Sequence, residues 1–366
     1  MSTTEDHAES GASTAGEQPI GGPYIEPSSP LPETVYHYTT AAGLLGIVNN
    51  DRKDDHVADR PRPLEFWASD LLDMNDATEL AFGLELMHQR VTQDRPDSSP
   101  PDTSSRFNGV LSVLDQYLGV PELDQNRSIE PRPSVCGASF STESDALSQW
   151  VRYGAGGGFA IGIKGCLLRD VPYAVVDPSG SGVEEFPCSF AEINYGEKAR
   201  GIIDGLPFLT PGSTGLLAAA FGVAGLVSLA KAVWDGIQDP EHKLKLPIHP
   251  ASPLIATATV AAAQCKDGAF SDEKEWRLLV GGNSERFADL LLNDAYPLKF
   301  RQKGDRLVPY RKVVVRHPEE GAVISELVVG PGPDQARVVH AAQRLLIANG
   351  HDPRVVHASK TPYRGW

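Results

Sequence analysis

The irregular order of its short β-prone segments is the feature that most restricts what this chain can fold into. Such segments recur along the sequence, and the stretches between them are variously helix-like, charged or rich in proline. A regular alternation of strands and helices would indicate a parallel α/β fold, but no such alternation extends through the chain. The sequence therefore predicts an α+β fold, with short mixed or antiparallel sheets and flanking helices.

Length and composition favour one large domain that carries additions. The chain has 366 residues, of which 41% are hydrophobic and 22% are charged. Residues 1–33 are polar and contain no Lys or Arg, which predicts a disordered acidic leader. We expect residues 34–366 to form a single α+β domain with a mobile Pro/Ser-rich loop at 92–105 and a helical insertion at about 201–265.

The charge balance restricts the classes of partner. The formal net charge is -15, and the six acidic residues of the leader leave about -9 for the rest of the chain. An acidic body of this kind binds nucleic acid or anionic membranes poorly, so we expect neither as a general partner. Residues 215–230 are apolar and rich in Gly and Ala, but a membrane-spanning helix needs roughly 20 strongly apolar residues. They predict a buried helix, with a membrane segment or an exposed partner helix as alternatives.

The four cysteines indicate reduced thiols rather than a metal or redox centre. Cys136, Cys166, Cys188 and Cys265 are widely spaced and form no Cys-x-x-Cys pair. The acidic N-terminus lacks the basic and apolar regions of a secretory signal. We therefore expect a cytoplasmic protein with mostly buried free thiols and no bound metal.

The stretch 35–40 is the first candidate for a functional strand. It is β-prone and runs directly into residues 41–48, which predict a short helix. His37 stands between two tyrosines at the end of this strand, where an imidazole can hold a ligand. The alternative is a half-buried strand in which the backbone satisfies His37, and periodicity does not separate the two.

A second candidate region begins at residues 135–141, a strand of small residues followed by a helix that carries Leu147, Trp150 and Tyr153. The glycine run 154–158 then precedes another strand. A dinucleotide-binding fingerprint follows a strand and opens a helix, so this run does not predict a Rossmann fold. It predicts either a permissive turn or a flexible lip over a ligand.

The third candidate is a strand at 275–280 that alternates its side chains. Glu275 and Arg277 fall on one face and the large apolar side chains on the other. This Glu–Arg pair is either a solvated ion pair or a buried catalytic acid that Arg277 keeps ionised. Near the C-terminus, Asp334 is placed to cap the helix that we predict over residues 334–348.

Several blocks of the sequence occur together in a specific order and resemble a known family. They are Tyr36-His37-Tyr38-Thr39, Asn75-Asp76 with Glu79, Ser139-Phe140-Ser141 followed by Leu147 and Trp150-Val151-Arg152-Tyr153, Glu273-Lys274-Glu275-Trp276-Arg277, Val328-Val329-Gly330-Pro331, and Ser359 with Tyr363-Arg364. In this order they resemble the bacterial family called domain of unknown function 2971, over about residues 35–364. The leader, the loop at 92–105 and the apolar stretch at 205–235 depart from it, and the second block lacks the Cys expected before Phe140-Ser141.

That family has no settled function, but its three central blocks are similar in kind and order to those of ADP-ribosyltransferases. This more distant resemblance implies that His37 binds a ribose of NAD and that Glu275, or less favourably Glu273, accepts a hydrogen bond from a ribose hydroxyl. It implies aromatic stacking by Tyr38 or Tyr153. The residues it assigns to catalysis are Glu275, His37 and Ser141, and those it assigns to NAD binding are His37, Tyr38, Thr39, Ser139, Phe140, Tyr153 and Arg277.

Three functional hypotheses follow. The first is an enzyme that cleaves the nicotinamide–ribose bond of NAD without a metal, in bacterial conflict or phage defence, with His37, a serine of the 139–141 block and Glu275 around one cleft. The second is a catalytically inactive module that binds a nucleotide or a partner in the same cleft, with Glu275 held by Arg277 or Lys274. The third is an unrelated α+β protein in which His37 and Glu275 lie far apart. The first hypothesis leaves open whether the acceptor of the ADP-ribose group is a protein or a nucleic acid.

Overall fold

The computed structural model describes residues 29–49, 61–71, 78–93, 135–154, 157–169, 171–176, 183–206, 258–280, 299–303, 305–316, 318 and 321–362. Most of the predicted leader and loop therefore lies outside the described residues. The same is true of 207–257, which holds most of the predicted helical insertion and its apolar stretch. Within these ranges, no helix has the length and apolar character needed to cross a membrane.

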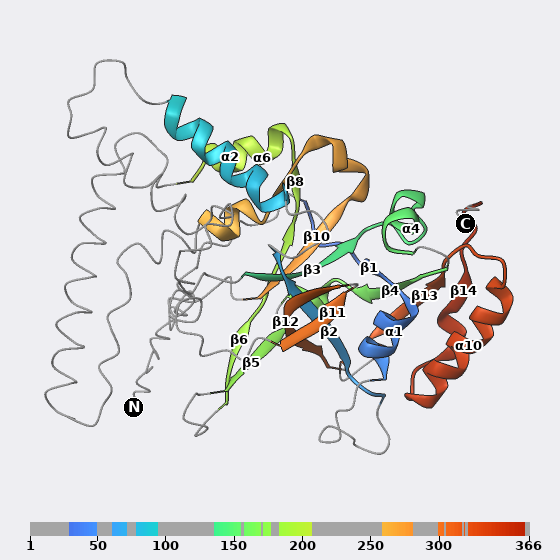
Figure 1. Cartoon of the computed structure of the whole chain (residues 1–366). Helices are drawn as coiled ribbons and strands as arrows, with labels where there is room; N and C mark the ends of the chain where they lie inside the picture. The colour runs from blue at the N-terminus through green and yellow to red at the C-terminus, as the bar shows by residue number, and fades with distance from the viewer. Residues whose placement is uncertain are drawn as a thin grey trace, which may run out of the picture.

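A ten-stranded, mostly antiparallel sheet forms the centre of the fold (Figure 1). Its strands are β1 (Thr34–Thr39), β2 (Leu64–Asp70), β3 (Cys136–Ser141), β4 (Phe159–Lys164), β7 (Ser189–Glu192), β10 (Glu275–Val280), β11 (Lys299–Lys303), β12 (Arg306–Val315), β13 (Ile324–Val329) and β14 (Val356–Ala358). Two small sheets pair β5 (Pro172–Val176) with β6 (Val183–Pro187) and β8 (Asn194–Tyr195) with β9 (Cys265–Lys266). The α+β class is confirmed, but the expectation of short sheets is wrong, because distant strands such as β2 and β12 join one large sheet.

Helices flank this sheet. They are α1 (Ala41–Val48), α2 (Thr78–Gln93), α4 (Leu147–Tyr153), α5 (Cys166–Arg169), α6 (Glu197–Asp204) and α10 (Gln335–Ala348), with a short helix at 258–262 and the 3₁₀ helices η3 (Gly268–Glu273) and η4 (Pro353–Val355). The α1 helix begins directly after β1, where the Thr40 side chain accepts a hydrogen bond from the Gly43 N–H. Asp334 occupies the N-cap position of α10, but its side chain makes no capping hydrogen bond, contrary to the prediction.

The sheet forks at β3, and this fork determines where the site lies. One edge of β3 pairs with β10 over its whole length. Two strands share the other edge of β3. The first residues of β3 pair with β2, where Ser69 lies opposite Gly137. The last residue of β3 pairs with β1, where Tyr36 lies opposite Ser141. The strands β1 and β2 therefore diverge beside Ser139.

Two hydrophobic cores pack on opposite faces of β10, as its alternating sequence predicts. Trp276, Leu278 and Val280 belong to the main core, which contains the side chains of β1 to β4. Leu279 belongs to a second core, formed with α2, α6 and the helix at 258–262. In Figure 1, α2 and α6 lie side by side near β8, well away from α1 and α10. Glu275 and Arg277 share the face of β10 that carries Leu279.

Candidate functional site at the fork of the sheet

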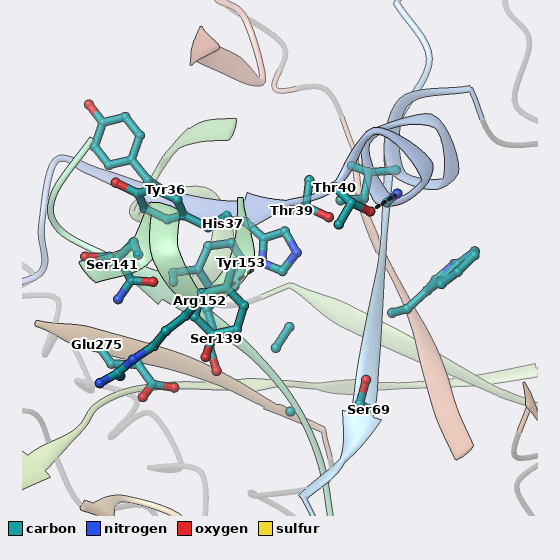
Figure 2. Close-up of a pocket in the computed structure, with 18 of the residues that line it drawn as sticks. Tyr36, His37, Thr39, Thr40, Ser69, Ser139, Ser141, Arg152, Tyr153 and Glu275 are labelled. Atoms are coloured by element: carbon teal, nitrogen blue, oxygen red, sulfur yellow. Dashed lines mark hydrogen bonds between the residues drawn. The ribbon is translucent and has the colours of Figure 1, made fainter. Parts of the chain in front are cut away.

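A cavity of about 440 Å³ lies at the fork between β1 and β2. This volume is typical of small-molecule sites. Eight of the nine residues that the sequence assigned to a site line it, and Figure 2 shows several of them. They are His37, Tyr38, Thr39, Ser139, Phe140, Ser141, Tyr153 and Glu275. Arg277 lies outside the lining but binds Glu275 directly. Because His37 and Glu275 line the same cavity, they do not lie far apart as the third hypothesis required.

His37 is fixed by the backbone on one side of its ring. Its Nδ1 lies 2.9 Å from the carbonyl oxygen of Ser139, at the point where β1 and β2 diverge. Because a carbonyl only accepts, Nδ1 carries the proton and Nε2 keeps its lone pair. Phe66 and Phe140 hold the ring, with ring centroids 5.3 and 5.4 Å away.

The surroundings of His37 keep it uncharged. Burial lowers its pKa to about 4, and the charge of Arg301 lowers it further against the opposing effect of the Ser139 hydrogen bond. The imidazole is therefore neutral near pH 7. His37 lines the cavity, and its Nε2 can accept a hydrogen bond from a hydroxyl or amide group of a ligand. His37 can therefore bind the backbone through Nδ1 and a ligand through Nε2 at the same time.

Glu275 is a buried carboxylate that two cations keep ionised. Its Oε1 accepts hydrogen bonds from Arg277 Nε at 3.0 Å and Nη2 at 2.7 Å, and its Oε2 accepts one from Lys266 Nζ at 3.0 Å. Burial alone would raise the pKa of this carboxyl, but the charges of Arg277 and Lys266 outweigh burial and lower the pKa to about 2. The backbone N–H of Glu275 donates to the Tyr195 hydroxyl at 2.9 Å, which fixes the start of β10.

The charges around Glu275 form a cluster that the sequence analysis did not anticipate. Lys266 is only 3% exposed, and its Nζ also donates to Glu273 Oε2 at 2.6 Å. Glu273 in turn forms an ion pair with Arg152 at the edge of the cavity. With Arg277, which binds Glu275, the cluster contains two carboxylates and three cations. Lys266 stands outside every motif of the sequence, so only the pairing of β8 with β9 reveals its position.

The two serines of β3 differ in what their hydroxyl groups do. Ser141 Oγ donates to the carbonyl oxygen of Glu273 at 2.7 Å and accepts from the Glu143 N–H at 3.1 Å, so it stabilises the loop after β3. Ser139 Oγ is buried and makes no hydrogen bond of normal geometry with a described residue. It still lies close enough to Glu275 to favour the ionised carboxylate. Of the two, Ser139 has the hydroxyl more available to a ligand.

The aromatic residues also divide into structural and accessible ones. The Tyr38 hydroxyl donates to the Glu143 carbonyl at 2.8 Å and accepts from the Ala146 N–H at 3.0 Å, and its ring packs edge-on against Trp150. Tyr153 is half-buried and lines the cavity from α4. The sequence analysis missed Trp67 of β2, which also lines the cavity.

Comparison of the chain with protein-family models, with curated proteins and with solved structures finds no match in any of the three. The likeness to domain of unknown function 2971 therefore rests on the order of the sequence blocks. Among the described residues, no three His, Cys, Asp or Glu side chains come together to hold a metal ion. Cys136, Cys188 and Cys265 are buried and Cys166 is exposed, and none of the four forms a disulfide with a described residue.

Proposed function

We propose that the cavity binds NAD and that the protein cleaves the nicotinamide–ribose bond, as an ADP-ribosyltransferase or an NAD glycohydrolase. One observation carries the proposal: a neutral imidazole on β1 and an ionised carboxylate on β10 line the same cavity, on either side of Ser139 (Figure 2). Together they offer two hydrogen-bond acceptors to the hydroxyl groups of one sugar.

The chemistry needs few groups from the protein. The bond between ribose C1′ and the pyridinium nitrogen breaks, and its electron pair leaves with neutral nicotinamide. Positive charge develops on the sugar, as in glycoside cleavage, and a fixed carboxylate stabilises it. A water molecule or an acceptor nucleophile then bonds to C1′ and loses a proton. Because the leaving group departs neutral, no general acid is required at the nicotinamide.

The lone pairs of Glu275 support a contact with the sugar. Arg277 supplies two donors to Oε1, whereas Lys266 supplies a single donor to Oε2. The proposal requires Oε2 to accept a further hydrogen bond, from a ribose hydroxyl, beside the one from Lys266. His37 Nε2 would bind a second hydroxyl, and Tyr153 offers an aromatic surface on the cavity wall.

The same contacts favour one alternative, a module that binds a nucleotide without turnover. Three donors already compensate the charge of Glu275, which weakens the electrostatic stabilisation it can give to a developing cation. The second hypothesis anticipated a restrained Glu275, although it named Lys274 where the structure has Lys266. Binding without nicotinamide release would select this alternative.

The direct test is release of nicotinamide from NAD by the purified full-length protein, with and without added lysate as a source of acceptor. Glu275→Gln keeps the shape of the side chain and removes its charge. We expect wild type to release nicotinamide and the variant to lose about 100-fold or more of that rate, because one fixed charge at the reacting centre is typically worth this much.

A matched control separates this role from a general loss of charge. Glu192 lies opposite Trp276 on the neighbouring strand β7 and does not line the cavity. Glu192→Gln should keep the wild-type rate. If Glu275→Gln releases nicotinamide as fast as wild type, Glu275 is not the carboxylate that stabilises the developing positive charge. If wild type releases none under either condition, the protein is not an NAD-cleaving enzyme.

A further inference from the structure

We propose that Arg301 and Ser69 form a phosphate-binding subsite at the end of the cavity opposite Glu275, so that the ligand is a nucleotide with its phosphate there. This inference deepens the proposed function, because it concerns the same cavity. It also stands without the cleavage step, since a phosphate can bind whether or not a glycosidic bond breaks.

Arg301 has guanidinium donors that no described carboxylate satisfies. Its Nη2 donates to Ser69 Oγ at 2.7 Å, and its Nε is buried and makes no hydrogen bond with a described residue. Among the described residues no carboxylate forms an ion pair with it, and burial lowers its pKa. Guanidinium pairs with phosphate through two parallel hydrogen bonds, so a ligand phosphate would satisfy the donor that the protein leaves unpaired.

The position of Arg301 places this subsite away from the carboxylate. Ser69 lies opposite Gly137 and Glu275 lies opposite Ser141, four residues further along β3. At 3.3 Å per residue this is a separation of about 13 Å along the strand. In Figure 2, Ser69 and Glu275 are on opposite sides of the view, with His37 between them. A ligand that reaches both ends is longer than one sugar ring, as a sugar diphosphate is.

The two ends also differ in their charged groups. At one end, the carboxylates of Glu275 and Glu273 are paired with cations of the protein. At the other end, Arg301 is the cation, and its planar group lies 5.8 Å from the ring of Trp67. Trp67 packs in turn on Tyr310, with ring centroids 5.0 Å apart. The Trp67 ring therefore lies within cation–π distance of the guanidinium.

Binding can be measured without cleavage. ADP-ribose and inorganic pyrophosphate contain the phosphates but no nicotinamide bond, and adenosine contains neither. We expect Arg301→Gln to weaken the binding of ADP-ribose and of pyrophosphate by about 10- to 100-fold, the usual cost of losing charge-assisted hydrogen bonds. Adenosine should bind wild type and variant alike. Titration calorimetry gives all three affinities.

Lys299 provides the matched control. It is an exposed cation on the same strand, two residues from Arg301, and it does not line the cavity. Lys299→Gln should change the affinity for pyrophosphate by no more than about twofold, since exposed charges are largely screened by solvent and salt. Arg301→Lys keeps the charge but not the planar fork, so it should bind with intermediate affinity, and circular dichroism would verify that each variant is folded.

A spectroscopic readout on His37 makes the test independent of affinity. The charge of Arg301 contributes to the low pKa of His37. Among the described residues, Arg301 is the charged side chain that shifts this pKa. Pyrophosphate at the subsite would neutralise that charge, so we expect the His37 pKa, followed by NMR, to rise on binding. In Arg301→Gln the added pyrophosphate should leave the His37 pKa unchanged.

The outcomes separate the subsite from the cleavage step. Equal binding of pyrophosphate and ADP-ribose to wild type and Arg301→Gln, or no binding to wild type, would overturn the subsite while a positive nicotinamide assay still stood. Binding of pyrophosphate without ADP-ribose would overturn the assignment to a nucleotide. Arg301-dependent binding of ADP-ribose in a protein that releases no nicotinamide would support the subsite and overturn the cleavage proposal.

Discussion

His37 links the stability of the sheet to its ligand site at the scale of one residue. Its Nδ1–H satisfies the Ser139 carbonyl where neither β1 nor β2 pairs with β3, so the fork does not leave this backbone acceptor unpaired. The same hydrogen bond fixes the tautomer that presents Nε2 as an acceptor. One side chain thus fills a gap in the sheet and prepares a contact for a ligand.

This residue makes the stability of the protein depend on pH. The pKa of His37 is lowered from 6.5 to about 4, so between these values the unfolded chain takes up a proton that the folded chain does not. The free energy of unfolding therefore falls as the pH falls through this window, by up to roughly 3 kcal/mol from this residue. Glu275 contributes separately at lower pH, because its pKa falls from 4.5 to about 2 and its stabilisation is lost between those values.

Replacing His37 with Asn isolates its share of the pH dependence. The Asn amide can donate to the Ser139 carbonyl but does not titrate, so the slope of unfolding free energy between pH 4 and 6.5 should become shallower. Urea unfolding at several pH values measures it. His340→Asn, on the exposed face of α10, should keep the wild-type slope. A slope unchanged in His37→Asn would contradict the buried, neutral state of this ring.

At the scale of elements, glycine decides how closely two helices approach. Gly83 lies in α2, where a Cβ would come within 2.5 Å of the Ala262 Cα and 2.7 Å of its carbonyl oxygen. The backbone of α2 therefore packs directly on the short helix at 258–262. That contact supports the second core behind β10, on the side of the strand that carries Glu275.

Two Gly→Ala substitutions should have opposite effects. Alanine favours a helix by about 1 kcal/mol relative to glycine, but overpacking a close contact costs about 1–3 kcal/mol. Gly83→Ala should therefore lower the free energy of unfolding by up to about 2 kcal/mol. Gly201 lies in α6 with no atom within 4 Å of the added Cβ, so Gly201→Ala should stabilise by up to about 1 kcal/mol. Thermal unfolding of both variants measures the difference, and equal effects would exclude the close contact.

At the scale of the whole molecule, Asp145 connects the C-terminal segment to the centre of the chain. Its Oδ1 accepts from Ser359 Oγ at 2.5 Å and from Trp150 Nε1 at 2.7 Å, and its Oδ2 accepts from the Lys360 N–H at 2.8 Å. Burial opposes ionisation, but these hydrogen bonds lower the pKa of Asp145 overall. Figure 1 shows the C-terminal end beside α4, which carries Trp150.

Removing this connection should destabilise the fold. We expect Asp145→Ala to lower the free energy of unfolding by about 2–4 kcal/mol, because three hydrogen bonds to a charged acceptor are lost together. Asp352→Ala removes an exposed pair with Arg354 and a hydrogen bond from the Arg354 N–H, and it should cost much less because exposed ion pairs add little to stability. Chemical denaturation at neutral pH compares the two. Equal costs would show that residues 359–361 contribute nothing to the stability of the whole fold.

The sequence by itself determined the local conformation of the site strands. The β-prone residues of β1, β3 and β10 lie where their patterns predict, as do the helices that follow β1 and β3. Alternation also placed Glu275 and Arg277 on one face of β10, where they form the predicted ion pair. These features depend on backbone propensity and on the spacing of side chains within one element, and both are written in consecutive residues.

The tertiary structure alone decided which of these elements meet. The ten-stranded sheet, the fork at β3, the second cation on Glu275 and the position of Arg301 all arise from pairings between distant segments. The resemblance assigned Ser141 to catalysis, and it lines the cavity, but only the fold shows that its hydroxyl binds the backbone of Glu273, 132 residues away in the sequence. Strand pairing and buried charge depend on packing among the whole set of side chains, so no local period encodes them.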